Sequence, residues 1–462
     1  MTLAATADVQ TAIDELRALL GERLSTSTGV RDHHSKDESW HIPHRPDAVA
    51  FPNTTEEVSQ IVRICARHRT PVVAYGTGTS LEGAVIPELG GVVVDLVNMD
   101  QVLKVNSEDL DVTVQARVTR KQLNDYIRDQ GLFFPIDPGA DASLGGMAAT
   151  RASGTNAVRY GTMRENVLGL TVVMADGRII RTSRRARKSA AGYDLTRLFV
   201  GSEGTLGIIT EVTLRLYGIP EAMAAAVCSF DTLEGAVSTV IQTIQLGVPV
   251  ARIELLDDVQ MDSVNKFSKL SYPVKDTLFI EFHGTESGVK EQAELVQAIA
   301  AENGGGEFKW ALKPEERTHL WQARHDVTYA NKALRPGCEI WATDVCVPIS
   351  RLAECILETK QDLKQSFLIA PMVGHVGDGN FHCGFLIDRN NPDEIKEAER
   401  LNERLVLRAL AMDGTCTGEH GIGLGKMKFL QAEHGEGVAV MREIKKALDP
   451  LNILNPGKIF SM

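Results

Sequence analysis

The sequence contains little cysteine, and each cysteine stands alone. Reduced thiols show this scattered pattern, whereas a disulfide framework, a haem c attachment site or a cysteine-ligated iron–sulfur cluster needs closely spaced pairs. No CxxC occurs, and the total of seven is odd. None of these three features is therefore expected. The cysteines are Cys65, Cys228, Cys338, Cys346, Cys355, Cys383 and Cys416.

Long apolar runs are also missing. No stretch approaches the ~20 apolar residues that a membrane-spanning helix needs. The N-terminal region, Met1 to Leu24, follows an amphipathic helical pattern with acidic residues and lacks the basic start and apolar stretch of a secretory signal. These features predict a cytoplasmic protein with no transmembrane segment, and peripheral attachment at the inner membrane stays open.

Basic patches are scarce as well. The formal net charge is −12, and the densest basic run, Arg178 to Lys188, is short. A protein that follows a phosphate backbone needs a basic face, so nucleic acid is not an expected partner. The run is expected to form a solvated hairpin or loop, and docking of an anionic partner there stays open.

What is present indicates a globular chain of more than one domain. Apolar residues make up 43% of the 462 residues and charged residues 24%, which is close to average usage. A helix opened by a capping box at Thr54–Glu57 precedes the apolar strands Pro71–Tyr75 and Val92–Leu96. Leu170–Ala175, followed by Asp176-Gly177, predicts a hairpin with a type I′ turn.

The pattern changes near Pro220. From there, predicted strands alternate with long helices, which indicates a second α/β domain. The tail after Lys428 is expected to be helical until Pro450 breaks it. The strands are expected at Ala224–Phe230, Leu278–Phe282 and Ile340–Val347, and the helices begin near Leu233, Ser287 and Ile349.

Three glycine-rich segments lie in the first half, at Gly76–Gly83, Pro138–Gly161 and Gly201–Thr210. Many small residues in one stretch favour a backbone that approaches a ligand closely, and three such segments imply an extended ligand. A glycine-rich turn without a ligand explains the first segment equally well. Neither GxGxxG nor a P-loop lysine is present, which argues against an NAD-dependent enzyme.

Histidines and a carboxylate suggest a metal site in the second half. His375 and His382 flank Gly377–Asn380, a turn that would let both side chains reach one point, and Glu419-His420 lies in a second glycine-rich loop. Two imidazoles and a carboxylate suit Zn²⁺ or Mn²⁺ with positions open for substrate. Two structural histidines in a hairpin explain the spacing about equally well.

Other polar residues carry weaker signals. Arg324 could bind a substrate carboxylate with two hydrogen bonds, but an ordinary arginine on a helix surface fits the same pattern better. The histidines of the first half are expected to be solvated or structural rather than catalytic. They are His33, His34, His41 and His44.

Taken together, these stretches resemble the vanillyl-alcohol oxidase and p-cresol methylhydroxylase (PCMH) superfamily of FAD enzymes, within it the D-lactate dehydrogenase (cytochrome) branch. The resemblance runs from about Pro46 to Phe460. The segments that carry it are Tyr75–Ser80, Phe199–Gly207, Gly374–His382, Gly418–Gly421 and Asn455–Lys458.

The resemblance implies an α+β fold. A PCMH-type FAD-binding domain of two subdomains is expected at residues 46–220, after an N-terminal helix and lead-in at 1–45. A ferredoxin-like α/β substrate domain with an antiparallel sheet is expected at 221–412, and a helical C-terminal segment at 413–462 would return to the FAD domain.

The resemblance also implies FAD contacts. Gly76 to Ser80 would bind the pyrophosphate, and Asn455 would lie near the flavin ring. Thr79 stands where some relatives attach FAD through a histidine, so the flavin is expected to be non-covalent. The residues implied are Gly76, Thr77, Gly78, Thr79, Ser80, Pro138, Gly139, Ser143, Gly146, Ser153, Thr155, Val158, Glu203, Gly204, Ile209 and Asn455.

The same resemblance assigns the second-half residues. His375, His382 and Glu419 would hold the divalent cation. His420 would be the general base, because a neutral imidazole can take the hydroxyl proton of a 2-hydroxy acid as its hydride leaves for the flavin. Arg324 and Asn380 would lie near the substrate.

The expected substrate is a small D-2-hydroxy acid, with D-lactate first. Trp341–Asp344 offers no lysine for the second carboxylate of D-2-hydroxyglutarate, and glycolate remains an alternative because a glycolate oxidase flavin subunit is a close relative. Electrons would pass to a separate cytochrome, quinone or electron-transfer flavoprotein. A homodimer is allowed. A non-catalytic flavin subunit is disfavoured, because it would not need these residues.

Overall fold

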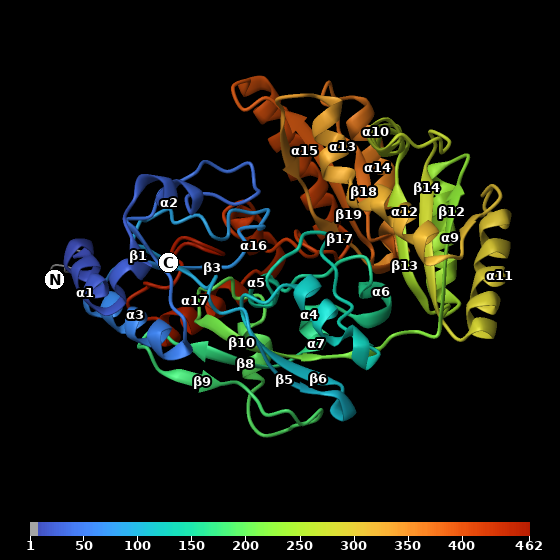
Figure 1. The fold of residues 1–462 in the computed structure, drawn as a ribbon. Coiled ribbons are helices and arrows are strands. Elements are labelled where there is room, and N and C mark those ends of the chain that lie inside the picture. The colour runs from blue at the N-terminus through green and yellow to red at the C-terminus, as the bar shows by residue number, and fades with distance from the viewer. Residues whose placement is uncertain (1–7) are drawn as a thin grey trace. The chain divides into compact units, whose positions relative to one another are not determined.

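The computed structural model describes residues 8–462, which form two compact units (Figure 1). Unit 1 comprises residues up to Ser153, Thr162–Gly218 and Glu419–Met462, and unit 2 comprises Gly154–Gly161 and Ile219–Gly418. Much of the predicted N-terminal helix is present as α1 (Val9–Leu20), and Met1 to Ala7 lie outside the described residues. Among residues 8–462, no helix is both long and apolar enough to cross a membrane.

Unit 1 begins with a small sheet that places the first glycine-rich segment. Strands β2, β4 and β3 run parallel and are fully or largely buried, and β1 adds an antiparallel edge. Helix α3 (Thr55–Arg67) joins β2 to β3, and Thr54 caps it by accepting from the Glu57 N–H at 3.2 Å. The strands are β1 (Leu24–Ser25), β2 (Ala48–Ala50), β3 (Val72–Tyr75) and β4 (Val92–Asp95).

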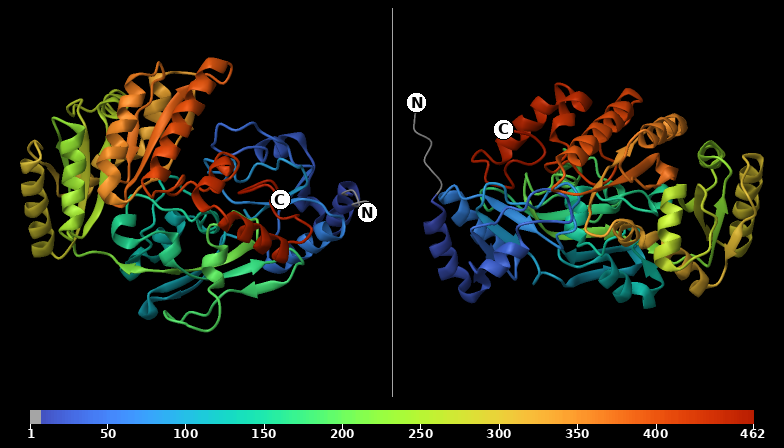
Figure 2. Two further views of the ribbon diagram at one scale, coloured as in Figure 1. Left: turned by 180° about the vertical axis from the view of Figure 1, so that it is seen from behind. Right: turned by 90° about the horizontal axis from the view of Figure 1, so that it is seen from above.

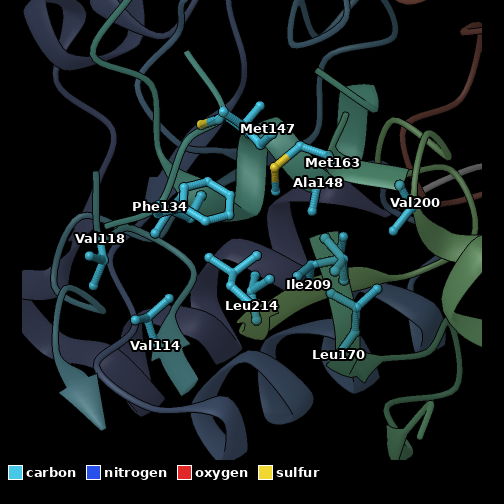
Figure 3. Packing of buried hydrophobic residues seen from close by; sticks show 14 of the residues in the cluster. Val114, Val118, Phe134, Met147, Ala148, Met163, Leu170, Val200, Ile209 and Leu214 are labelled. Atoms are coloured by element: carbon cyan, nitrogen blue, oxygen red, sulfur yellow. The ribbon is translucent and has the colours of Figure 1, made fainter. Parts of the chain in front are cut away.

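A five-stranded antiparallel sheet forms the second layer of unit 1, in the order β5-β6-β10-β8-β9. Its inner face packs with α5 (Leu144–Thr150) around Phe134, Met147, Met163 and Leu214, which gather in one cluster (Figure 3). The strands are β5 (Val102–Asn106), β6 (Asp111–Gln115), β8 (Val167–Val173), β9 (Ile179–Arg181) and β10 (Ile208–Arg215).

Short elements complete unit 1. Strands β7 and β11 pair as a separate ribbon, and the C-terminal helices α16 and α17 belong to this unit. The remaining elements are α2 (Thr28–His33), α4 (Arg120–Ile127), β7 (Leu132–Phe133), α7 (Met163–Asn166), α8 (Leu195–Phe199), β11 (Tyr217–Gly218), α16 (Met427–His434) and α17 (Gly437–Leu448).

The predicted hairpin is present, but the predicted type I′ turn is wrong. Backbone bonds join Met174 to Arg178 at 2.9 Å and the Gly177 N–H to the Met174 carbonyl at 2.8 Å, which leaves three residues in the loop. A type I′ turn needs two consecutive residues with positive φ, and here Gly177 (φ +78°) has one while Asp176 does not. The three-residue loop with a left-handed glycine is the next most common hairpin geometry.

Unit 2 is built on an antiparallel sheet. Its first half follows β12-α9-β13 and then β14-α11-β15, with the spatial order β15-β12-β14-β13, which is the ferredoxin-like arrangement. These elements are β12 (Ala222–Ser229), α9 (Leu233–Gln245), β13 (Val250–Leu256), α10 (Asp258–Ser268), β14 (Thr277–Gly284), α11 (Glu286–Glu302) and β15 (Lys309–Ala311).

Helices cover both faces of this half-sheet (Figures 1 and 2). On one face, α11 packs against α9, β12 and β14. On the other, Ala225, Val227 and Phe279 share an apolar cluster with Leu320 and Trp321 of α12. Helix α12 (Pro314–His325) carries Arg324, so this packing places that side chain.

The second half of unit 2 extends the sheet from β13 through β18 and β19 to β16. The predicted strand Ile340–Val347 is interrupted at Thr343 and Asp344, because both residues bond within the site described below. Its two parts each pair with β19. The elements are α6 (Ala157–Tyr160), α13 (Val327–Leu334), β16 (Glu339–Ala342), β17 (Val345–Cys346), α14 (Leu352–Lys364), β18 (Met372–Gly374), β19 (Asn380–Ile387) and α15 (Pro392–Ala411).

Candidate active site

The first two glycine-rich segments meet in unit 1. The Ser143 N–H lies 3.3 Å from the Thr77 hydroxyl, and a Cβ on Gly76 would come within 2.3 Å of the Ser143 Oγ. Gly78 has φ +68°, and a Cβ there would lie 2.1 Å from the Tyr75 hydroxyl oxygen. A side chain at Gly76 would have to displace the Ser143 hydroxyl, and at Gly78 the positive φ itself disfavours a side chain. The structure therefore brings Gly76, Thr77, Gly78 and Ser143 together, and their binding of FAD remains a prediction.

The third segment is joined to the C-terminal loop through Glu203. This carboxylate is buried and accepts the N–H groups of Ile422 at 2.7 Å and Gly423 at 2.8 Å. Burial raises the pKa of Glu203, although both backbone donors oppose that shift. Its main-chain carbonyl accepts from the Asn455 Nδ2 at 2.7 Å, as does that of Ala84 at 2.8 Å.

Buried polar atoms in unit 1 test whether an extended ligand fits there. Within residues 8–462, the Asn455 Oδ1 and the Ser202 Oγ are buried and have no hydrogen-bond partner. Orphaned buried acceptors and hydroxyls cost free energy unless another group satisfies them. Together with the close glycine backbone, they fit a polar cofactor such as FAD.

The other predicted contacts divide between the units. Most lie in unit 1, but Thr155 and Val158 lie in Gly154–Gly161, which belongs to unit 2. Val158 contacts the histidine turn, because a Cβ on Gly377 would lie 2.7 Å from its side chain. The unit 1 contacts include Thr79, Ser80, Pro138, Gly139, Gly146, Ser153, Gly204 and Ile209.

The predicted histidine turn is confirmed in unit 2. Strands β18 and β19 pair on either side of it, and His375 and His382 are buried with ring centroids 5.5 Å apart at 80°. Gly379 has φ +81°, and a Cβ there would lie 2.1 Å from the Val347 carbonyl oxygen. The turn can close only with glycine at this position, and its closure brings both imidazoles together.

Oxygen atoms orient both imidazoles. The His375 Nδ1 lies 2.7 Å from the Glu254 Oε1, and the His382 Nδ1 lies 3.0 Å from the Thr343 carbonyl. A carbonyl or carboxylate acceptor assigns the proton to Nδ1, which leaves the Nε2 lone pair for a metal ion. This chemistry fits a divalent cation better than it fits two histidines that only fill a hairpin.

Arg324 is not an ordinary surface arginine. Its side chain is 12% exposed, and its Nε and Nη2 lie 2.9 and 2.8 Å from the Glu254 Oε2. Burial raises the pKa of Glu254, but its interactions and hydrogen bonds with His375 and Arg324 outweigh burial and hold the pKa below its usual value. Sequence reasoning missed Glu254. The one available signal was the charged pair Arg252 and Glu254 inside the apolar strand β13.

Asn380 anchors the far side of the turn. Its Nδ2 donates to the Asp344 Oδ1 and to the Val345 carbonyl, both at 2.7 Å. The Thr417 hydroxyl donates to the other Asp344 oxygen at 2.7 Å. Asp344 thus fixes the segment that ends unit 2 at Gly418, one residue before Glu419. Its role was not apparent from the sequence.

His420 lies in unit 1, next to Glu419. Its Nδ1 lies 3.9 Å from the Glu82 Oε1, and Glu82 also pairs with the buried Lys426 at 3.1 Å. The Leu424 N–H donates to the Glu82 carbonyl at 2.7 Å. Glu82 therefore anchors the loop that carries Glu419 and His420. That Glu419 joins the two histidines at one ion remains a prediction.

The close approach at Gly379 makes a testable prediction. Gly379→Ala should lower the free energy of unfolding by more than Gly337→Ala, measured by urea denaturation. Both glycines have φ above +80°, but a Cβ on Gly337 would meet nothing within 4 Å. The left-handed backbone should cost about 1–2 kcal/mol in each variant. In Gly379→Ala, the clash with Val347 should add about 1–3 kcal/mol. Equal losses would contradict the packing described here.

Sequence comparisons decide the family. A family profile described as FAD linked oxidases, C-terminal domain, matches residues 219–459, and one described as FAD binding domain matches residues 46–183. The chain belongs to the FAD-linked oxidase family. It is an FAD-dependent oxidoreductase, as the resemblance implied.

Curated relatives match over nearly the whole chain. A probable mitochondrial D-lactate dehydrogenase of Danio rerio is 55% identical and covers 99% of this chain and 93% of that protein. A mitochondrial D-lactate dehydrogenase (cytochrome) of Arabidopsis thaliana is 47% identical, covering 97% and 79%. The glycolate oxidase subunit GlcD of Bacillus subtilis is 35% identical, covering 95% and 94%.

Solved structures confirm the fold class. p-Cresol methylhydroxylase with substrate bound superposes with a TM-score of 0.81 at 19% identity, covering 98% of this chain and 97% of that one. A 4-ethylphenol oxidase from Gulosibacter chungangensis gives the same TM-score at 19% identity, covering 100% and 99%. The α+β fold with a PCMH-type FAD-binding domain is thus confirmed.

The expected location is wrong. The sequence predicted a cytoplasmic protein, but the four D-lactate dehydrogenases of 42–55% identity are all mitochondrial. These relatives point to a mitochondrial rather than a cytoplasmic location. The amphipathic N-terminal pattern and the absence of a secretory signal therefore did not decide the compartment.

Proposed function

We propose that this chain oxidises D-lactate to pyruvate as an FAD-dependent dehydrogenase that passes its electrons to a separate acceptor. The observation that carries the proposal is the arrangement of His375, Glu254 and Arg324 in unit 2. In it, one buried carboxylate contacts both an imidazole, which would bind the metal ion, and a guanidinium. The D-lactate dehydrogenases at 42–55% identity support the choice of substrate.

The flavin would be held without a covalent bond. The glycine backbone of Gly76–Ser80 would bind the pyrophosphate, Ser143 would support that segment, and the Asn455 amide would face the flavin end. Thr79 has no nucleophilic imidazole for a covalent link. Bound FAD supplies the acceptor for the hydride from the α-carbon of the substrate.

A divalent cation would be bound by His375, His382 and Glu419. Both imidazoles are oriented through Nδ1, which suits Zn²⁺ or Mn²⁺ bound at Nε2. When bound, such an ion supplies a Lewis acid for the carboxylate and hydroxyl oxygens of a 2-hydroxy acid.

The remaining residues would accept the hydroxyl proton of the substrate and bind its carboxylate. His420 accepts the hydroxyl proton at Nε2, since its Nδ1 faces the Glu82 carboxylate. Arg324 pairs with the substrate carboxylate through the part of its fork that Glu254 does not occupy. Asn380 keeps the turn and Asp344 in place. One proton to His420 and one hydride to FAD balance the oxidation of lactate to pyruvate.

Glycolate is the second candidate substrate. It differs from D-lactate by one methyl group, and two bacterial glycolate oxidase subunits are 32–35% identical to this chain. A cytochrome is the favoured acceptor, because several relatives are D-lactate dehydrogenases (cytochrome).

The decisive experiment is anaerobic flavin bleaching. We expect D-lactate to bleach the flavin absorbance of the purified chain rapidly, with L-lactate and D-2-hydroxyglutarate much slower. L-Lactate presents its α-hydrogen on the opposite face, and the Trp341–Asp344 segment offers no cation for a second carboxylate. Stopped-flow absorbance measures the rates.

Each result has a clear meaning. Faster bleaching by glycolate than by D-lactate would favour the second candidate. A flavin that no 2-hydroxy acid reduces would contradict the proposed reaction, although the FAD-linked oxidase family would still hold.

A further inference from the structure

Glu254 is a buried carboxylate in the middle of β13 whose two oxygens have different partners. The Oε1 lies 2.7 Å from the His375 Nδ1, and the Oε2 lies 2.8 Å from the Arg324 Nη2 and 2.9 Å from its Nε. Its side chain is 1% exposed. Water therefore cannot replace either partner, and each oxygen is committed to one of them.

The contact with His375 sets the protonation of the imidazole ring. A carboxylate at Nδ1 keeps the proton there, fixes the plane of the ring and increases the electron density at Nε2. Outer carboxylates of this kind typically change metal affinity by 10–100-fold when they are removed. The His382 Nδ1 lies 3.0 Å from a main-chain carbonyl and 3.5 Å from the Asp344 Oδ1, whereas the His375 Nδ1 lies 2.7 Å from the Glu254 carboxylate. Glu254 therefore makes the closer carboxylate contact of the two.

The contact with Arg324 orients its guanidinium and compensates the charge of that group. Arg324 lies in the last turn of α12, and the fork geometry of arginine allows one edge to bind Glu254 while another edge faces a second anion. Without Glu254, Arg324 would lose the acceptor that sets its rotamer. Its charge would then be buried and uncompensated.

A second carboxylate holds the same helix one turn earlier. Glu281 of β14 accepts from the Trp321 Nε1 at 2.5 Å, and it lies 3.4 Å from the Arg252 Nε. Burial would raise the pKa of Glu281, but the charge of Arg252 and the bond to His283 bring it down to about 2. Trp321 and Arg324 are three residues apart and so share one face of α12. Two buried carboxylates of neighbouring strands thus fix that face.

We propose that Glu254 is a positioning residue that ties the cation ligand His375 to the substrate-binding Arg324, so that its loss weakens cation binding and hydroxy-acid binding together. This inference rests on the proposed function. It adds that the two binding steps share one buried group, which neither the relatives nor the family profiles indicate.

The substitution Glu254→Gln tests it. The glutamine oxygen can still accept from His375, but its NH₂ group would face the donors of Arg324, and the negative charge is gone. We expect Zn²⁺ to bind about 10–100-fold more weakly in calorimetric titration without substrate. We also expect KM for D-lactate to rise at least about 10-fold, because the charged pair that places Arg324 is lost.

Two further variants separate the effect on Zn²⁺ binding from the effect on hydroxy-acid binding. Arg324→Ala should raise KM while Zn²⁺ affinity stays close to that of the wild type, because Glu254 still contacts His375. Glu394→Gln is the matched control. Glu394 is another buried glutamate that binds an arginine, Arg335, through both oxygens, and its other hydrogen bonds come from Asp388 and Asn391. It should change neither quantity.

The outcomes distinguish this inference from the proposed function. If the wild type oxidises D-lactate and binds Zn²⁺ but Glu254→Gln binds Zn²⁺ equally well, the inference is wrong and the function stands. If the wild type binds neither Zn²⁺ nor Mn²⁺, the proposed metal site and this inference fail together. If Glu254→Gln does not fold, Glu254→Asp, which keeps the charge, must show a smaller version of both losses or the inference is overturned.

Discussion

Replacing His420 with glutamine should lower kcat for D-lactate by about 10²–10⁴-fold, the usual contribution of a general base. Glutamine keeps a polar side chain of similar reach but cannot accept a proton near neutral pH. The lactate hydroxyl would then keep its proton as the hydride leaves, and no neighbouring base on the proposed assignment replaces it. Steady-state kinetics with an artificial electron acceptor measures the change.

The effect should be confined to catalysis. His420→Gln should retain flavin and Zn²⁺, because the proposed ligands His375, His382 and Glu419 are intact. The control is His434→Gln, at the end of α16 in the same unit, whose side chain is 42% exposed. A variant at His420 that turns over as fast as this control would remove His420 from the proposed mechanism.

Local sequence signals predicted the histidine turn because its causes are local. Gly377–Asn380 cannot continue a strand, so the odd spacing of His375 and His382 could still place both on one side, and the pair is found 5.5 Å apart. The capped helix that begins after Thr54 and the first strands of unit 2 were predicted for the same reason. Their signals lie within a few neighbouring residues.

Glu254 could not be predicted in this way. It lies 121 residues from His375 and 70 from Arg324, and only the pairing of β13 with β18 and the packing of α12 bring them together. A charged residue in an apolar strand was the only hint. The sequence pattern favoured Arg324 on a helix surface, because a pattern within one helix does not show which partner covers it.

The two local errors have physical causes as well. Asp176-Gly177 is typical of a two-residue turn, but the Met174 N–H donates to the Arg178 carbonyl and sets a longer loop, with only Gly177 in the left-handed region. The apolar run Ile340–Val347 reads as one strand, but the strand is interrupted at Thr343 and Asp344, although the Thr343 N–H still donates to the Cys383 carbonyl of β19 at 2.9 Å. Asp344 then binds Asn380 and Thr417 instead. Tertiary contacts therefore outweigh the local pattern at Asp344.

Removing the divalent cation should have an effect as large as the loss of His420. We expect chelation to lower kcat/KM for D-lactate by about 10³-fold, because a Lewis acid contributes several kcal/mol to such a reaction. Zn²⁺ or Mn²⁺ added back should restore activity. His382→Ala should show the same loss without restoration, because it removes one of the three proposed ligands.

Bound metal must be measured beside activity, by mass spectrometry of the desalted protein. His319→Ala is the matched control, since His319 is an exposed histidine on α12 of the same unit. It should keep both metal and turnover. If His382→Ala retains a full equivalent of metal, the ligand assignment is wrong; if the metal-free wild type still turns over normally, the ion is structural. In that case the alignment of lactate would fall to Arg324, and Arg324→Ala should then cause the larger loss in kcat/KM.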